Sequence, residues 1–245
     1  MTEKELKPLQ QQARWAFGGV VALTLALFFV PYGQYVIYPV MLFSTYAHEM
    51  GHGIAAILMG GSFLDFQMWA DGSGVARHAG NYGDFARGVV AAGGLLGPAI
   101  LAAVFFLLSR RAFWSRLALY GFAAASVVAV LLFVRNGFGV GFVLLVALVC
   151  AAVARLGGER IAQFFLLFLA VQLSLTVFSR GDYLFVEYAN TAAGPMPSDV
   201  GQMSQALGGP YWLWGGLVGL MSVAILVGGA LLFFRSEAAG AAKAA

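Results

Sequence analysis

Three ionisable residues lie close together inside an otherwise apolar stretch of the chain. His48, Glu49 and His52 form the pattern H-E-x-x-H within the apolar run from Val36 to Met59. On a helix, positions i and i+4 project from one face, so both imidazoles can bind the same metal ion. A catalytic zinc site uses three protein ligands and a water whose pKa falls towards about 7, and a neighbouring carboxylate can accept that water's proton. The pattern therefore predicts a hydrolytic zinc site, with His48 and His52 as ligands and Glu49 as general base.

The surroundings of this pattern strengthen the prediction. Each ionisable group near the centre of a bilayer costs about 2.5 to 3.5 kcal/mol to insert, and such groups usually face a polar interior. Three of them within five residues favour a bound metal over the alternative, a metal-free network of histidine and glutamate side chains.

A third zinc ligand must come from another segment of the fold. The candidates are the acids and the histidine of the polar segments: His78, Asp65, Asp71, Asp84, Asp182, Glu187 and Asp199. We favour Asp199, because it follows Pro195 and Pro197 at the predicted start of a helix between two membrane spans. Asp182 is the next choice, and His78 fits an exposed position better.

The composition indicates that the bilayer surrounds the elements that must position these residues. The chain has 245 residues, of which 61% are hydrophobic and 10% are charged, whereas soluble proteins carry roughly 25% charged residues. The net charge of +3 is explained by arginines beside helix ends, which can pair with lipid phosphates, so we do not expect nucleic-acid binding. The single cysteine, Cys150, lies in an apolar run and can form no internal disulfide.

Apolar runs long enough for membrane helices recur along the chain, so the predicted fold is an all-α polytopic membrane protein with about seven transmembrane helices. A polar N-terminal segment (1–14) precedes one membrane-embedded domain (15–235), and a disordered tail (236–245) follows it. The fourth and fifth spans are separated by three residues and form either a tight helical hairpin or a broken pair. The predicted spans are Trp15 to Val30, Val36 to Met59, Val89 to Leu108, Leu117 to Val134, Phe138 to Val153, Ile161 to Phe178 and Trp212 to Phe234.

Two polar segments between the spans have their own structural signals. Residues alternate from Leu64 to Ala70, with Leu64, Phe66 and Met68 on one face, and Asp71 to Gly74 supply a turn. This pattern predicts a small β-hairpin after the zinc-binding helix. In the second segment, Ser198 is expected to cap a short helix from Asp199 to about Leu207.

Taken together, these stretches resemble the site-2 protease family of intramembrane metalloproteases, especially its compact, M50B-like bacterial branch. His48 to Gly53 look like the family's H-E-x-G-H helix, and Gly93 to Pro98 resemble the glycine-proline stretch of its next core helix. The segment from Asn190 to Asp199 is similar to the family's asparagine, proline and aspartate motif. Here Pro195 comes five residues after Asn190, where the family has three, and Val200 follows Asp199 in place of glycine.

The resemblance implies specific roles for these residues. Asp199 is expected to be the third zinc ligand, and Asn190 a contact of the substrate or the transition state. The glycine-containing helix would lie beside the zinc-binding helix, although Gly93 and Gly97 also have the spacing of simple close helix packing. The hairpin would be a plain loop or an edge that holds an unwound substrate strand. A multi-pass protein of the bacterial inner membrane is implied.

The resulting prediction is an intramembrane zinc metalloendopeptidase that cuts a membrane-anchored protein substrate. Two alternatives stay open: a catalytically inactive zinc-binding membrane scaffold, and a membrane transporter. A transporter usually carries its site on broken helices in repeated halves, and we see no internal repeat.

Overall fold

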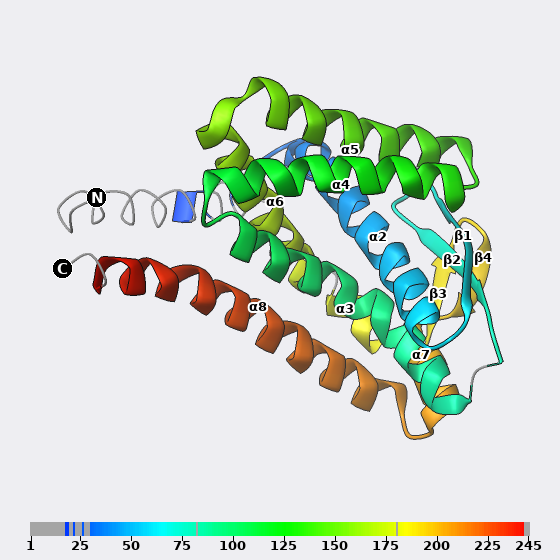
Figure 1. Ribbon diagram of the computed structural model, residues 1–245. Coiled ribbons are helices and arrows are strands. Elements are labelled where there is room, and N and C mark those ends of the chain that lie inside the picture. The colour runs from blue at the N-terminus through cyan, green and yellow to red at the C-terminus, as the bar shows by residue number, and fades with distance from the viewer. Residues whose placement is uncertain are drawn as a thin grey trace.

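The chain folds into a bundle of long helices with two small β-hairpins at one end (Figure 1). The computed structural model describes residues 18–19, 22, 26, 30–81, 83–179 and 181–242. The helices are α2 (Gly33–Leu58), α3 (Asp84–Leu108), α4 (Ala112–Leu132), α5 (Gly137–Leu156), α6 (Gly158–Ser179), the 3₁₀ helix η1 (Gly181–Phe185), α7 (Asp199–Leu207) and α8 (Tyr211–Ala242). The strands are β1 (Ser62–Met68), β2 (Gly74–Ala79), β3 (Tyr188–Thr191) and β4 (Gly194–Pro197).

Five of the described helices, α3, α4, α5, α6 and α8, are long and apolar enough to cross a membrane. The predicted count of about seven is therefore not confirmed. The run from Val36 to Met59 forms α2, which is not among the five because the polar residues of the H-E-x-x-H pattern interrupt its apolar sequence. The predicted span from Trp15 to Val30 lies mostly outside the described residues. The fourth and fifth predicted spans form α4 and α5, which pack against each other as a helical hairpin.

Helix α3 is central to the bundle, because it packs against α2, α6, α7 and α8. Its glycines bring it close to α2: a Cβ at Gly97 would lie 2.8 Å from the carbonyl oxygen of Ala47, and one at Gly93 would lie 2.8 Å from that of Gly51. Both positions require the absence of a side chain. The expected close packing through Gly93 and Gly97, beside the helix that carries His48, is confirmed.

The predicted first hairpin is present, with β1 and β2 paired antiparallel. The predicted alternation is wrong at Leu64, because the register shifts between Phe63 and Asp65. Leu64 is 49% exposed, whereas Phe66 and Met68 are fully buried. Asp65 is buried too, and forms a two-point ion pair with Arg77 on β2.

The segment between α6 and α8 contains the predicted short helix and a second hairpin that the sequence did not predict. Helix α7 begins at Asp199, and the hydroxyl of Ser198 accepts a hydrogen bond from the Gly201 N–H at 3.1 Å, which confirms the expected cap. Strands β3 and β4 pair antiparallel, with Asn190 opposite Pro195.

Helix α8 continues past Ser236, into the segment for which we expected disorder. Cys150 is buried in the core between the helices. The division of the chain at residues 14 and 235 stays a prediction.

Candidate metal centre

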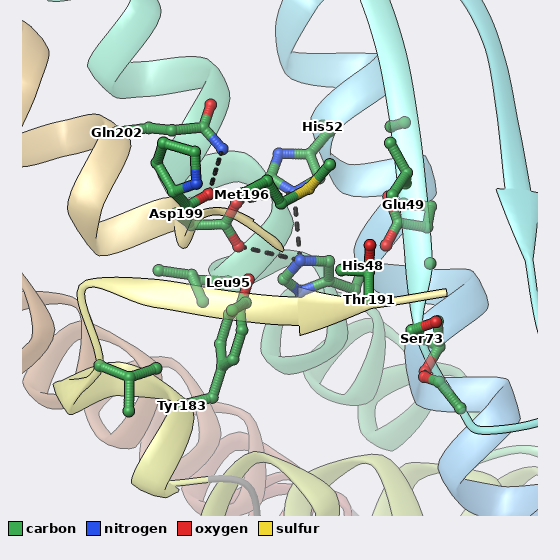
Figure 2. Close-up of a pocket in the computed structure, with 18 of the residues that line it drawn as sticks. His48, Glu49, His52, Ser73, Leu95, Tyr183, Thr191, Met196, Asp199 and Gln202 are labelled. Carbon is green, nitrogen blue, oxygen red and sulfur yellow. Dashed lines mark hydrogen bonds and ion pairs between the residues drawn. The ribbon is translucent and has the colours of Figure 1, made fainter. Parts of the chain in front are cut away.

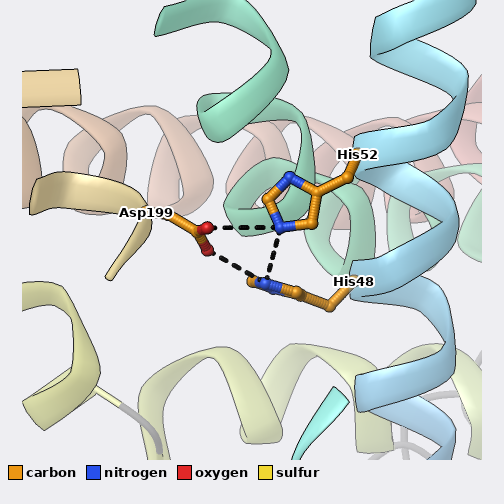
Figure 3. Close-up of side chains that lie close together, drawn as sticks. All are labelled: His48, His52 and Asp199. Carbon is orange, nitrogen blue, oxygen red and sulfur yellow. Dashed lines mark hydrogen bonds and ion pairs between the residues drawn. The ribbon is translucent and has the colours of Figure 1, made fainter. Parts of the chain in front are cut away.

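Three side chains from two distant segments converge at the end of the bundle that carries the hairpins (Figure 3). His48 and His52 lie one turn apart on α2, with their Nε2 atoms 3.1 Å apart. Asp199 reaches them from the first turn of α7: Oδ2 lies 3.0 Å from Nε2 of His48, and Oδ1 lies 3.3 Å from Nε2 of His52. One carboxylate and two imidazoles thus direct their ligand atoms towards one point.

The spacing of these atoms fits a tetrahedral zinc ion. Zinc bonds of about 2.0 to 2.1 Å at tetrahedral angles separate neighbouring ligand atoms by about 3.3 Å, close to the three distances observed. Oδ2 of Asp199 is buried, and within the part of the chain that the structure describes it accepts no well-oriented hydrogen bond. A buried carboxylate needs compensation of its charge, and a cation held between Oδ2 and Nε2 of His48, its neighbour at 3.0 Å, would supply it. The described residues that can hold a metal together are these three.

The orientation of His52 is set by a backbone group of α3. Nδ1 of His52 lies 2.9 Å from the carbonyl oxygen of Val90, and because a carbonyl can only accept, Nδ1 must donate. The lone pair of the neutral ring is then on Nε2, the nitrogen that faces Asp199 and His48. Metal-binding histidines are commonly held in this way by a partner behind the ring. Gly94 makes room for the same ring, because a Cβ there would overlap Nε2 of His52.

The position of Asp199 depends on the structure that precedes α7. The Ser198 hydroxyl also donates to the carbonyl oxygen of Val186, and the Ser198 N–H donates to the carbonyl oxygen of Glu187 at 2.9 Å. Ser198 is fully buried and Asp199 is 3% exposed. Burial alone would raise the pKa of Asp199, but the adjacent His52 and His48 hold that pKa well below its usual range, so the carboxylate form is favoured.

A cavity of about 370 Å³ opens beside the three side chains. Glu49 lies at its wall on the side of β2, and is 4% exposed. Figure 2 shows His48 and His52 lying between Asp199 and Glu49, with Ser73 on the same side as Glu49. The cavity therefore has a carboxylate in its wall beside the predicted ligands.

The second hairpin forms another wall of the cavity. Asn190 and Thr191 of β3 and Met196 of β4 line it, and the backbone N–H of Ala192 at the hairpin tip donates to the Ser73 hydroxyl at 3.2 Å. The ring of Tyr183 on η1 meets that of His48 edge-on, with centroids 6.2 Å apart. Asn190 is exposed to the cavity, where the expected contact with a substrate is possible.

The other candidates for the third ligand have different surroundings. Asp65 pairs with Arg77, Asp71 accepts hydrogen bonds from Ser73 in the first hairpin turn, and Asp84 is 74% exposed beside Arg87. Glu187 is exposed, and His78 lines the cavity from β2. Asp182 belongs to η1, but its side chain lies outside the described part of the chain. Asp199 is the acid that the fold brings to the two histidines.

Three contributors to the site were not found from the sequence: Val90, Gly94 and Gly74. Val90 acts through its backbone, which carries no residue-type signal. In the sequence, Gly94 is part of a glycine-rich stretch whose spacing, next to Gly93 and Gly97, indicates helix packing. Gly74 fits a turn in the sequence, whereas in the structure it packs against Glu49.

The family comparison agrees with this geometry. A model of the Peptidase M50B-like family matches residues 20–229. The chain belongs to this family, a branch of the site-2 proteases. The family is one of metallopeptidases of membranes, and with five apolar helices the chain is a multi-pass membrane protein. No similar protein was found among curated proteins or among solved structures.

Proposed function

We propose that this chain is a zinc metalloendopeptidase that hydrolyses a peptide bond of a membrane-anchored protein. The observation that supports it most is the convergence of His48, His52 and Asp199 at zinc-like spacing, next to Glu49, in a member of a peptidase family. A bacterial inner membrane is the setting that the family likeness suggests.

The chain's own residues have separate roles in this proposal. Zinc, when bound by His48, His52 and Asp199, would polarise the scissile carbonyl and acidify a water. Glu49 takes the proton of that water on its carboxylate and delivers it to the nitrogen of the leaving amine. Asn190 lines the same cavity, and we assign to its side-chain amide the donation of a hydrogen bond to a substrate carbonyl.

The cavity also constrains the substrate. It lies between two hairpins and is lined by apolar residues such as Leu95, Pro98 and Met196. A regular helix keeps its carbonyl groups in internal hydrogen bonds, so a substrate helix must unwind locally before a peptide bond can reach Glu49. We therefore expect substrates whose spans contain helix-weakening residues.

Zinc content tests the ligand assignment. We expect about one zinc per chain in protein purified with zinc, a loss in His48→Ala and Asp199→Ala, and retention in Glu49→Gln. Asp182→Ala tests the alternative ligand, and Asp84→Ala is the matched control at an exposed acid. Wild-type protein without zinc in replete buffer would overturn the proposal.

Cleavage tests the reaction. Single-span reporter proteins whose spans carry a glycine-proline pair would be reconstituted with the enzyme in liposomes, and products identified by mass spectrometry. We expect cleavage by wild type and none by Glu49→Gln. A wild type that binds zinc but cuts no reporter would favour a scaffold, whereas equal cleavage by both forms would overturn the role of Glu49.

A further inference from the structure

The two outer edges of the first hairpin face different parts of the molecule. On β1, the Phe66 N–H donates to the carbonyl oxygen of Phe133 at 2.9 Å, and the Phe66 carbonyl accepts from the Arg135 N–H at 3.1 Å. The side chain of Asn136 bonds both backbone groups of Met68. The connection between α4 and α5 therefore covers the outer edge of β1, and the other edge of this sheet is formed by β2.

The register shows which β2 groups face that edge. Ala76 lies opposite Phe66, and Gly74 lies opposite Met68. Phe66 and Met68 direct their backbone groups away from β2. Phe66 with Ala76 and Met68 with Gly74 are therefore non-hydrogen-bonded pairs of the antiparallel ladder. The N–H and C=O groups of Ala76 and Gly74 thus point away from β1, towards α2.

Glu49 is the side chain of α2 that meets this edge. The outward-facing backbone N–H of Ala76 lies near enough to the Glu49 carboxylate to stabilise the negative charge. Gly74 lies against the same carboxylate: a Cβ there would overlap Oε1 and would lie 2.8 Å from Cδ. The backbone of Gly74 does not have positive φ, so glycine serves here to leave space.

We propose that β2 is a positioning element for Glu49, in which the Ala76 N–H holds the carboxylate and the missing side chain of Gly74 leaves the space that the carboxylate occupies. The inference rests on the proposed role of Glu49 as general base, and adds two positioning residues to it. A glutamate side chain has several rotamers. Holding Glu49 in one rotamer before the reaction removes the entropic cost of ordering it during the reaction.

The hairpin is itself held in place against α2. The hydroxyl of Thr45, one turn before Glu49, donates to the carbonyl oxygen of Gly72 at 2.8 Å. On the far side, Asn136 and the backbone of residues 133–135 hold β1. Strand β2 is therefore fixed at its turn and through its partner strand, so its edge can act as a rigid support.

A double-mutant cycle tests the contact without any substrate. In the wild-type background, Gly74→Ala should lower the melting temperature of the detergent-purified protein by about 2 °C or more. In a Glu49→Ala background the overlapping carboxylate is gone, and the same change should be neutral or slightly stabilising, as alanine usually is at a compatible glycine. Equal shifts in both backgrounds would overturn the proposed contact. Gly121→Ala, where a Cβ meets nothing within 4 Å, is the matched control.

Kinetics on a cleaved reporter test the positioning. Gly74→Ala should lower kcat at least tenfold, within the range of general acid–base catalysis, with KM and zinc content unchanged. Ala76→Pro is the second variant, because it removes the N–H at an edge position that does not pair with β1. Unchanged kcat in both variants would overturn the positioning role.

The two experiments separate this inference from the proposed function. If wild type cuts no reporter, the peptidase proposal fails, while the melting cycle still decides whether Gly74 and Glu49 are coupled. If wild type cuts and the cycle shows no coupling, only the positioning role of β2 is lost.

Discussion

Gly94 lies directly beneath the imidazole of His52, so close that a Cβ at position 94 would overlap Nε2. This nitrogen is the one that faces Asp199. The packing of α3 against α2 and the shape of the metal centre therefore depend on the same glycine.

Substitution of this glycine should reduce zinc binding. In Gly94→Ala, the added methyl must push His52 away from Asp199 or force the helices apart. We expect zinc content well below that of wild type, measured by elemental analysis after dialysis. Gly121→Ala on α4 should bind zinc normally, and normal zinc content in Gly94→Ala would contradict the placement of His52.

Removal of the metal should lower stability. A ligand at about 100 times its Kd stabilises the folded state by about 2.7 kcal/mol, and this zinc would join α2 to α7. Chelation should therefore lower the melting temperature of wild type, but leave that of His48→Ala almost unchanged. The same shift in both proteins would mean that the chelator acts elsewhere.

Loss of the cap on α7 should weaken both the helix and the site. Ser198→Ala removes the acceptor for the Gly201 N–H and the donor to Val186, and we expect a loss of about 1 kcal/mol together with weaker zinc binding. A zinc titration followed by thermal unfolding measures both. Ser204→Ala, in the same helix but bonded to Gly209 at its other end, should leave zinc affinity unchanged.

The connection between α4 and α5 should protect the first hairpin. Asn136→Ala removes both side-chain hydrogen bonds to Met68, which should cost about 1 to 3 kcal/mol where buried groups lose their partners. Hydrogen exchange followed by mass spectrometry should show faster exchange across Ser62–Met68, with α8 unchanged. Uniformly faster exchange would indicate general destabilisation instead.

The turn of the first hairpin should weaken in acid. The Ser73 hydroxyl and N–H both donate to Asp71, and they hold the pKa of that carboxyl below its usual range. The stabilisation that these two hydrogen bonds give is present at neutral pH and is lost as the pH falls through the lowered pKa of Asp71. Asp71→Ala should thus speed exchange of the Ser73 amide near neutral pH, and the difference from wild type should disappear only in acid below the usual range of an aspartate pKa. A constant difference at all pH values would contradict this.

The sequence predicted the parts of the site that depend on local patterns. The spacing of His48 and His52 requires a helix, and Ser198 before Asp199 has the form of a cap; both elements were found. The second hairpin was not predicted, because Pro195 and Pro197 argue against a strand. In the structure both prolines are compatible with strand β4, because among the described residues β4 pairs with β3 alone.

Contacts between distant segments were beyond sequence reasoning. Residues 133–136 look like a short linker, and only the fold shows that they pair with β1. The register shift at Leu64 likewise cannot be predicted from the alternation of apolar and polar residues. The roles of Gly74 and Gly94 depend on which side chain lies opposite, and this information exists only after helices and hairpin have packed.

Most of the chain's length separates His52 from Asp199. During synthesis, a chain that has delivered α2 to the membrane still lacks its third candidate ligand until α3 to α6 have followed. If Asp199 completes the centre, the nascent protein has no working site while its own spans are being inserted next to it. Such an order of assembly would keep a hydrolase from acting on unfolded membrane segments, including its own, before it is complete.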